Sequence, residues 1–369
     1  MAKHSKLSAS GSDRWLKCHG SLFLDPNAVI KDNSEAAEIG TMIHLISEDC
    51  IMHKRGSDKL VGKVFPVGNN SYEFTKEHSV LADMYIDYVL AVIGNKGNKL
   101  PFVLEKQVDY SKWAFGGFGT ADCIVHDKVN KIVHIIDLKT GRIEVNAKDN
   151  SQLMLYALGA KESYKIKDDY SFNLTIVQPR INKIDSHIIA TDELLAFGDY
   201  VMAQSDAITF GSKKRVIGDH CKFCPNNPTC PELNNQVVRM FKTVPDETVQ
   251  NMIEVYNLSD TIKSYLDKLE SYLYEQALAG VELDGLKLVE SRTKRTWAEN
   301  AEKRLIEVLG ESAYVKKLIS ITDAKTLLKD KDMSLDELTI KPDGKPELVS
   351  ANDKRPPVSI ITFESLKGE

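Results

Sequence analysis

The sequence contains no long apolar segment. No stretch approaches the roughly 18 unbroken apolar residues that a membrane-spanning helix needs. The N-terminal residues MAKHSKLSASGSDRW lack the apolar core of a signal peptide, and the chain has no G-x-x-x-x-G-K-[ST] loop for binding nucleotide phosphates. These absences predict a cytoplasmic protein with no membrane partner and no nucleotide-driven motor of its own.

The chain is also poor in cysteine and carries no strong excess of charge. Its net charge of -5 argues against a generally basic protein that coats nucleic acid, although a local basic groove is compatible with it. Six cysteines in an intracellular chain are more often ligands or buried thiols than disulfides. The 369 residues, 42% hydrophobic and 27% charged, suffice for two domains or one large domain with an appendage.

Helix and strand patterns alternate over about residues 40 to 210. Apolar periodicity and turn residues predict, in chain order, helix 40–54, helix 74–93, strand 102–110, strand 119–127, strand 131–140, helix 146–164, strand 171–180 and helix 191–208. We expect a hairpin turn at 127–131, an end to the last strand at Pro179, and Thr191 or Asp192 as the N-cap of the last helix. The order predicts an α/β fold.

The stretch IIDLKTG places two charged residues at the end of an apolar strand. Alternation along a strand puts the side chains of Asp137 and Lys139 on the same face, with Leu138 between them. One interpretation is an ordinary ion pair at a sheet edge. The other is a catalytic pair, which requires partners elsewhere in the chain.

A candidate partner is Asp122 on the preceding predicted strand. If the two strands form a hairpin, Asp122 lies beside Asp137, and two such acids repel unless a cation lies between them. Hard divalent cations such as Mg²⁺ prefer oxygen ligands of this kind. Lys139 would then polarise a water or stabilise charge on a phosphoryl oxygen. The glycines at 116, 117 and 119 permit a tight turn or a close backbone approach there.

Two helices offer further candidates. His44 could add a nitrogen ligand, and Gly40, one turn earlier, would let its helix press against the sheet. Gln152 and Tyr156 are four residues apart and share a helix face. Taken alone, His44 and Tyr156 are more typical of structural positions and Gln152 of a surface position.

Together these residues follow the order G-x-x-x-H, G-x-x-D, D-x-K and Q-x-x-x-Y across an α-β-β-β-α-β pattern. This order resembles the PD-(D/E)XK nuclease superfamily, specifically its RecB-like branch. The resemblance covers about residues 8 to 235. It implies a mixed central sheet flanked by helices and a deoxyribonuclease that depends on Mg²⁺ or Mn²⁺ and hydrolyses phosphodiesters by in-line attack of water.

The resemblance also implies a role for each matching position: metal ligation by His44, Asp122, Asp137 and the backbone carbonyl of Leu138, catalysis by Lys139, and DNA-proximal support by Gln152 and Tyr156. Glu105, in FVLEKQVDY, is either an acid that supports the ligands from behind or a residue of the strand face.

Three cysteines cluster in HCKFCPNNPTCPEL with the spacing C-x2-C-x5-C, at Cys221, Cys224 and Cys230. A tetrahedral metal or a cubane cluster requires a fourth ligand, and Cys18 is the natural candidate. A zinc site and unliganded thiols remain alternatives. Similarity to AddB-type nucleases, which carry one cysteine before the nuclease core and three after it, implies a structural [4Fe-4S] cluster. Cys50 and Cys123 are then expected to be buried apolar residues.

These features divide the chain into five predicted segments: 1–39 with one cluster cysteine, 40–217 as the nuclease core, 218–235 as the iron–sulfur segment, 236–282 as a helical region with a long helix from 246 to 279, and 283–369 as a small α+β region with a helix near 298–309. The last segment contains SRTKRTW, in which Arg292, Lys294, Arg295 and Trp297 suit contact with phosphates and a stacked base. A solvated basic strand explains them equally well.

The whole chain further resembles an uncharacterised family of bacteriophage and prophage proteins that begin with a similar LSAS…RWLKCHGS and end with a similar DKRPP. This implies an exonuclease that processes single- or double-stranded DNA ends in phage recombination or replication, in the cytoplasm of a bacterial host cell. A phage single-strand-binding or annealing protein is a candidate partner, and homo-oligomerisation is left open. Two rival hypotheses are a catalytically silent DNA-binding or assembly protein on the same fold and a redox-sensing regulator.

Overall fold

The computed structural model describes residues 5–23, 35–94, 99–242 and 249–286. The chain divides into two units, Met1–Leu283 and Asp284–Glu369. The basic motif at 291–297 and the helix predicted near 298–309 lie outside the described residues.

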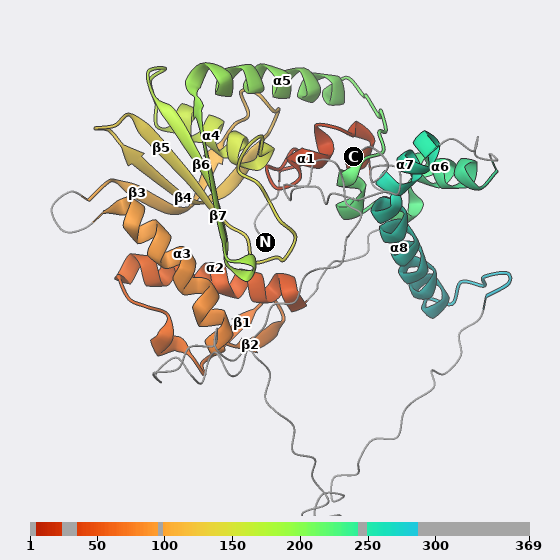
Figure 1. Ribbon diagram of the computed structural model, residues 1–369, viewed down its shortest axis with the longest axis horizontal. Helices are drawn as coiled ribbons and strands as arrows, with labels where there is room; N and C mark the ends of the chain where they lie inside the picture. The colour runs from red at the N-terminus through yellow and green to blue at the C-terminus, as the bar shows by residue number, and fades with distance from the viewer. Residues whose placement is uncertain (1–4, 24–34, 95–98, 243–248, 287–369) are drawn as a thin grey trace, which may run out of the picture. The chain divides into compact units, whose positions relative to one another are not determined.

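A five-stranded mixed sheet forms the centre of the first unit (Figure 1). Its strands lie in the order β3-β4-β5-β6-β7 and comprise β3 Phe102–Asp109, β4 Phe118–Asp127, β5 Ile132–Leu138, β6 Ser171–Gln178 and β7 Lys183–Ala190. All neighbours pair antiparallel except β5 and β6, which are parallel. A parallel pair needs a crossover, and helix α4, Ser151–Ser163, lies in that connection.

Helices cover both faces of the sheet (Figure 1). Helices α2, Glu35–His53, and α3, Lys76–Ile93, share one apolar core with one face, while α4 and α5, Thr191–Thr209, share a second core with the other. Alternation along β5 sends Ile135 to the α4 side and Ile136 to the α2 side. Because both faces are covered, the central strands read as nearly continuous apolar runs. The predicted α/β class with a mixed sheet is confirmed.

Smaller elements surround this core. They are helix α1 Ser12–Trp15, strands β1 Val64–Val67 and β2 Asn70–Glu73, helices α6 Pro231–Lys242, α7 Val249–Asn257 and α8 Ser259–Leu278, and short 3-10 turns at His19–Leu22, Asp58–Leu60, Pro179–Ile181, Asp219–Phe223 and Asn227–Thr229. Strands β1 and β2 pair as an antiparallel hairpin. No helix among the described residues is both long and apolar enough to cross a membrane.

Three local predictions were wrong. Strand β7 was not expected, because Pro179 was taken as the end of the last strand. Pro179 instead opens a tight turn into β7, and Asn182 closes that turn with a left-handed φ of 50°. The N-cap of α5 is Ala190, and the Thr191 hydroxyl instead donates to the Tyr170 carbonyl at 2.7 Å. The long helix predicted at 246–279 is interrupted at Leu258, between α7 and α8.

Candidate functional site

The hairpin of β4 and β5 brings two acids together. The register that pairs Cys123 with Ile136 places Asp122 opposite Asp137 at the end of the ladder. Beyond that point, the Asp122 side chain replaces a backbone acceptor, because its Oδ2 accepts a hydrogen bond of 2.7 Å from the Leu138 backbone N–H. The side chain of Asp122 is 12% exposed and that of Asp137 only 3% exposed. Two carboxylates therefore lie side by side on adjacent strands, largely shielded from water.

Lys139 and Gln152 form a connected network around Asp137. Lys139 Nζ lies 2.9 Å from Asp137 Oδ2 and donates to Gln152 Oε1 at 2.8 Å. Gln152 Nε2 in turn donates to Asp137 Oδ1 at 3.0 Å and to the Tyr156 hydroxyl at 3.1 Å. This set of contacts fixes the orientation of the Gln152 amide. The sequence-predicted pair D-x-K is thus joined to the helix-borne pair Q-x-x-x-Y by direct hydrogen bonds.

The glycine at position 119 in β4 leaves room for the Tyr156 ring. A Cβ atom on Gly119 would lie 2.8 Å from Tyr156 Cε1, so any larger residue at this position would displace the ring. Burial, and next the negative charge of Asp137, raise the pKa of Tyr156, so its hydroxyl stays protonated at neutral pH. A second close contact joins α2 to the segment that follows β5, because a Cβ atom on Gly40 would lie 2.8 Å from Thr140 Oγ1.

His44 approaches the acids from helix α2. Its Nδ1 lies 3.4 Å from Asp122 Oδ2 and 3.8 Å from Glu105 Oε1. One ligand atom from each of these three residues lies within 4.8 Å of the other two. A histidine nitrogen with two carboxylate oxygens is a donor set that suits Mn²⁺ and Mg²⁺.

The ladder between β3 and β4 is distorted at this point. Leu104 pairs with Cys123 and Lys106 with Ala121, but the intervening Glu105 has a left-handed φ of 43°. Such a backbone conformation is uncommon for glutamate and stores about 1–3 kcal/mol. The distortion also resets the side-chain alternation, because Val103 and Val108, five residues apart, pack against the same core. It directs the Glu105 carboxylate towards His44 and Asp122.

The crowding of charge shifts the pKa values of both Asp122 and His44. Burial, and next the neighbouring charge of Asp137, raise the pKa of the Asp122 carboxyl to about 7. Burial lowers the pKa of His44, but the nearby carboxylates of Glu105, Asp122 and Asp137 outweigh it, so the net shift is upward. The shift favours the protonated form of His44, whose positive charge would lie among the acids.

The residues present fit a divalent cation. Asp137 Oδ2 is buried and has the Lys139 ammonium 2.9 Å away as its charged partner. The His44–Glu105–Asp122 group, and the raised pKa of Asp122 where two acids lie side by side, both favour a cation at this position.

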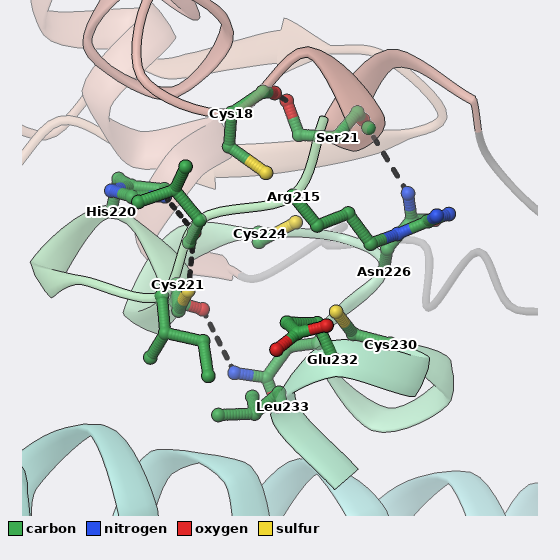
Figure 2. Close-up of a pocket in the computed structure, with 14 residues that line it drawn as sticks. Cys18, Ser21, Arg215, His220, Cys221, Cys224, Asn226, Cys230, Glu232 and Leu233 are labelled. Carbon is green, nitrogen blue, oxygen red and sulfur yellow. Dashed lines mark hydrogen bonds between the residues drawn. The ribbon is translucent and has the colours of Figure 1, made fainter. Parts of the chain in front are cut away.

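The four predicted cluster cysteines line one pocket (Figure 2). Cys18 comes from the N-terminal segment. Cys221 lies in the first 3-10 turn after α5, Cys224 directly follows that turn, and Cys230 directly follows the second. Cys18, Cys221 and Cys224 are buried, and Cys230 is partly exposed. Burial, with a smaller contribution from the three other cysteines, raises the pKa of the Cys221 thiol to about 11.

Hydrogen bonds hold the N-terminal segment against the chain that follows α5. The Gly20 backbone N–H donates to the Lys214 carbonyl at 2.9 Å, and a Cβ atom on Gly20 would lie 2.4 Å from Arg215 Cγ. His19, which is buried, lies 2.8 Å from Ser212 Oγ and 3.0 Å from Gln204 Oε1 through its two ring nitrogens. Residues about two hundred positions apart in the sequence therefore meet at the pocket.

A family model described as "Protein of unknown function (DUF2800)" matches residues 4–356. The chain belongs to the DUF2800 family.

The DUF2800 chain also has a distant likeness to a solved structure described as "Crystal structure of SSO0001". The likeness has 16% sequence identity and a TM-score of 0.26, and it covers 43% of this chain and 72% of that chain. A likeness this weak carries no argument about fold or function.

Sequence reasoning left one site residue open and missed others in this DUF2800 protein. Glu105 was ambiguous, and the structure places it beside His44 and Asp122. Gln178 and Asp185, which hydrogen-bond to the loop after Lys139, were not recognised. The only available signal was the position of Gln178 immediately before Pro179, a polar residue at the end of the apolar run of β6.

Proposed function

We propose that this DUF2800 protein is a metal-dependent deoxyribonuclease of the PD-(D/E)XK type, with a RecB-like core. The observation that carries the proposal is the connected arrangement of Asp137, Lys139 and Gln152 beside the His44–Glu105–Asp122 group. A lone ion pair would need neither the half-buried Gln152 amide that bonds to both partners nor three further ligand groups next to it. The proposed role is an exonuclease that processes DNA ends in phage recombination or replication.

The ligands proposed for the cation are His44, Asp122, Asp137 and the backbone carbonyl of Leu138, to which the structure adds Glu105 as a candidate. A divalent cation held there would polarise a phosphoryl oxygen and ease deprotonation of a water. Burial lowers the pKa of Lys139, but the adjacent charge of Asp137 more than offsets this, so the net shift is upward. The ammonium therefore stays charged at neutral pH and stabilises negative charge on the phosphoryl group.

We also propose that the cysteine pocket holds a [4Fe-4S] cluster, because four cysteines line it and four thiolates are the ligand set of such a cluster. A zinc ion held by the same four thiolates is the alternative. A cluster there would tie the N-terminal segment to the chain after α5.

The test compares linear and covalently closed circular DNA as substrates. Wild-type protein should degrade linear DNA in the presence of Mg²⁺ or Mn²⁺, and leave closed circles intact. Variants Asp122→Ala and Asp137→Ala should be inactive on both, although circular dichroism shows them folded. Cleavage of closed circles would replace the exonuclease with an endonuclease, and cleavage by a folded Asp137→Ala variant would refute the proposed site.

Two rival functions make different predictions. A catalytically silent DNA-binding or assembly protein would bind DNA ends without any metal-dependent cleavage. A redox regulator would carry a labile cluster whose oxidation changes DNA binding, again without cleavage. The complete set Asp122, Asp137 and Lys139 favours the nuclease, because a silent protein has no need of two neighbouring, largely buried acids beside a lysine.

A further inference from the structure

A buried glutamine fixes the loop that follows Lys139. Gln178, at the end of β6, is 1% exposed. Its Nε2 donates to the carbonyls of Gly141 at 3.0 Å and Ile143 at 2.6 Å, and its Oε1 accepts from the Val145 N–H at 3.1 Å. The Gln178 amide has two donor and two acceptor directions, and three of these four are used on a five-residue stretch of the loop.

Strand β7 holds the second half of the same loop. Asp185 Oδ2 accepts from the Ala147 backbone N–H at 2.7 Å. Lys183 Nζ donates to Glu144 Oε1 at 2.7 Å and to Asn146 Oδ1 at 2.8 Å. Because Lys183 neutralises Glu144, this acid at the end of the exposed part of the loop contributes little repulsion towards an approaching anion.

The bonds to Val145 and Ala147 help to bury a core, because Ala147 is buried in it and Val145 packs against it. The bonds from Gln178 to the Gly141 and Ile143 carbonyls have no such purpose, since the loop tip, residues 141–144, is exposed throughout. Loops on protein surfaces are ordinarily the most mobile parts of a fold. A buried side chain that orders an exposed tip therefore serves to place what the tip presents. The tip presents one cation, Arg142.

We infer that Gln178 is a positioning residue that holds Arg142 against a backbone phosphate of nucleic acid bound at the Asp137–Lys139 site. Arg142 follows Lys139 by three residues, so their Cα atoms lie within about 11 Å of each other. A guanidinium on a side chain of this length can reach the phosphate next to the one at Lys139, and its fork matches phosphate oxygens. This inference rests on the proposed function for the nature of the substrate.

The test measures equilibrium binding of a fluorescent DNA oligonucleotide with Ca²⁺ in place of Mg²⁺, across a salt series. Arg142→Ala should weaken binding about three- to tenfold, and should make the log–log salt dependence shallower by about one unit or slightly less. Gln178→Met, which keeps the side-chain volume but loses the amide, should change both quantities in the same direction. In Gln178→Met, hydrogen exchange at the Val145 amide should accelerate, because that amide loses its acceptor.

Matched controls separate positioning from general stability. Lys128→Ala removes an exposed cation at the turn before β5, at the opposite end of that strand from Leu138. Asn173→Leu removes a side-chain hydrogen bond to His134 near the start of β6, the strand that Gln178 ends. Both controls should keep the wild-type salt slope, even if they lower the melting temperature.

The outcomes are distinguishable from those of the nuclease proposal. Wild-type salt slopes in both Arg142→Ala and Gln178→Met would overturn this inference while leaving metal-dependent cleavage standing. A slope change in Arg142→Ala alone would overturn the role of Gln178. If the wild-type protein binds DNA with the expected slope changes in the variants but never cleaves it, the inference holds and the nuclease proposal fails. Absence of any DNA binding would overturn this inference.

Discussion

Replacement of Lys139 by methionine separates the catalytic from the structural interpretation of the D-x-K pair. Methionine keeps a similar length but removes the ammonium that lies 2.9 Å from Asp137 Oδ2. It also removes the donor to Gln152 Oε1. The change therefore leaves a buried carboxylate without its cationic partner, in a site where other acids already crowd it.

The expected loss of stability follows from the burial of Asp137. Breaking a fully buried ion pair costs about 3–5 kcal/mol, because one charge remains buried without a partner. The Asp137 side chain is 3% exposed but that of Lys139 is 29% exposed, so part of the pair is already screened by water. We expect the metal-free variant to lose about 2 kcal/mol of unfolding free energy. Mn²⁺ should restore most of this loss, because a bound cation replaces the missing positive charge.

The assay combines denaturant unfolding, with and without Mn²⁺, and cleavage of labelled DNA. Cleavage by Lys139→Met should fall about 100- to 1000-fold, which is the usual effect of losing one group that stabilises transition-state charge. Lys161→Met is the matched control. Lys161 pairs with Asp168 at 2.6 Å, its side chain is 12% exposed, and it lies near the C-terminal end of α4. The control should lose about 1 kcal/mol and keep its activity.

The catalytic interpretation fails if Lys139→Met unfolds more easily but cleaves DNA at the wild-type rate. That result would make the pair an ordinary ion pair at the sheet edge. If Mn²⁺ stabilises the variant no more than it stabilises the wild type, the proposed position of the cation beside Asp137 is wrong.

Four further predictions concern the metal ligands and the cysteine site. Glu105→Ala and Glu105→Gly should both weaken Mn²⁺ binding about tenfold. The glycine variant should be more stable than the alanine variant by about 1 kcal/mol, because glycine accepts a φ of 43° without strain. Equal unfolding midpoints of the two variants would contradict backbone strain at this position. The pKa of Asp122 is raised to about 7, so below that pH a cation must displace a proton from its carboxyl. The Mn²⁺ affinity measured by calorimetry should therefore fall as the pH is lowered from about 8 to about 6. An affinity that does not change with pH would contradict ligation by Asp122. His44→Ala should need more Mn²⁺ for its residual activity, whereas an unchanged metal titration with a lower melting temperature would make His44 structural. Cys18→Ser should lose the brown colour of anaerobically purified protein and its nuclease activity. It should also lose roughly 5 kcal/mol of stability, because the cluster closes a loop of about two hundred residues. Zinc without iron in elemental analysis of the wild type would replace the cluster with a zinc site.

Much of the core could be predicted because its strands are buried on both faces. Runs such as KIVHIID are apolar enough to identify as strands, and the turn at 127–131 fixes which strands pair. Pairing of the hairpin then brings Asp122 next to Asp137 without any further information. The same-face rule likewise anticipated the contact between Asp137 and Lys139.

The features that escaped prediction depend on contacts between distant residues. The left-handed backbone at Glu105 has no local signal, because glutamate rarely adopts it and only the surrounding packing maintains it. Strand β7 was hidden by Pro179, which reads as a terminator but here opens a hairpin. Gln178 has no periodic pattern around it, since a single polar residue at a strand end is compatible with many roles.

The cysteine site could be predicted from the sequence only in part. The spacing of Cys221, Cys224 and Cys230 indicated a metal centre, but spacing alone could not identify the fourth ligand. The structure brings Cys18 into the same pocket across about two hundred residues. The identity of the centre remains a prediction, because it depends on which metal the four thiolates bind.

The central claim is that Asp137 holds a cation that cleaves DNA, and one measurement tests it most directly. End-labelled single- and double-stranded DNA is incubated with wild-type protein and with Asp137→Asn over a Mn²⁺ titration, with a chelator as the blank. Asparagine keeps the shape of the side chain and removes its charge. We predict release of label by the wild type that saturates with Mn²⁺ and is abolished by the chelator, and none by Asp137→Asn at any Mn²⁺ concentration. Equal release by the two proteins, or no release by the wild type at saturating Mn²⁺, would contradict the account.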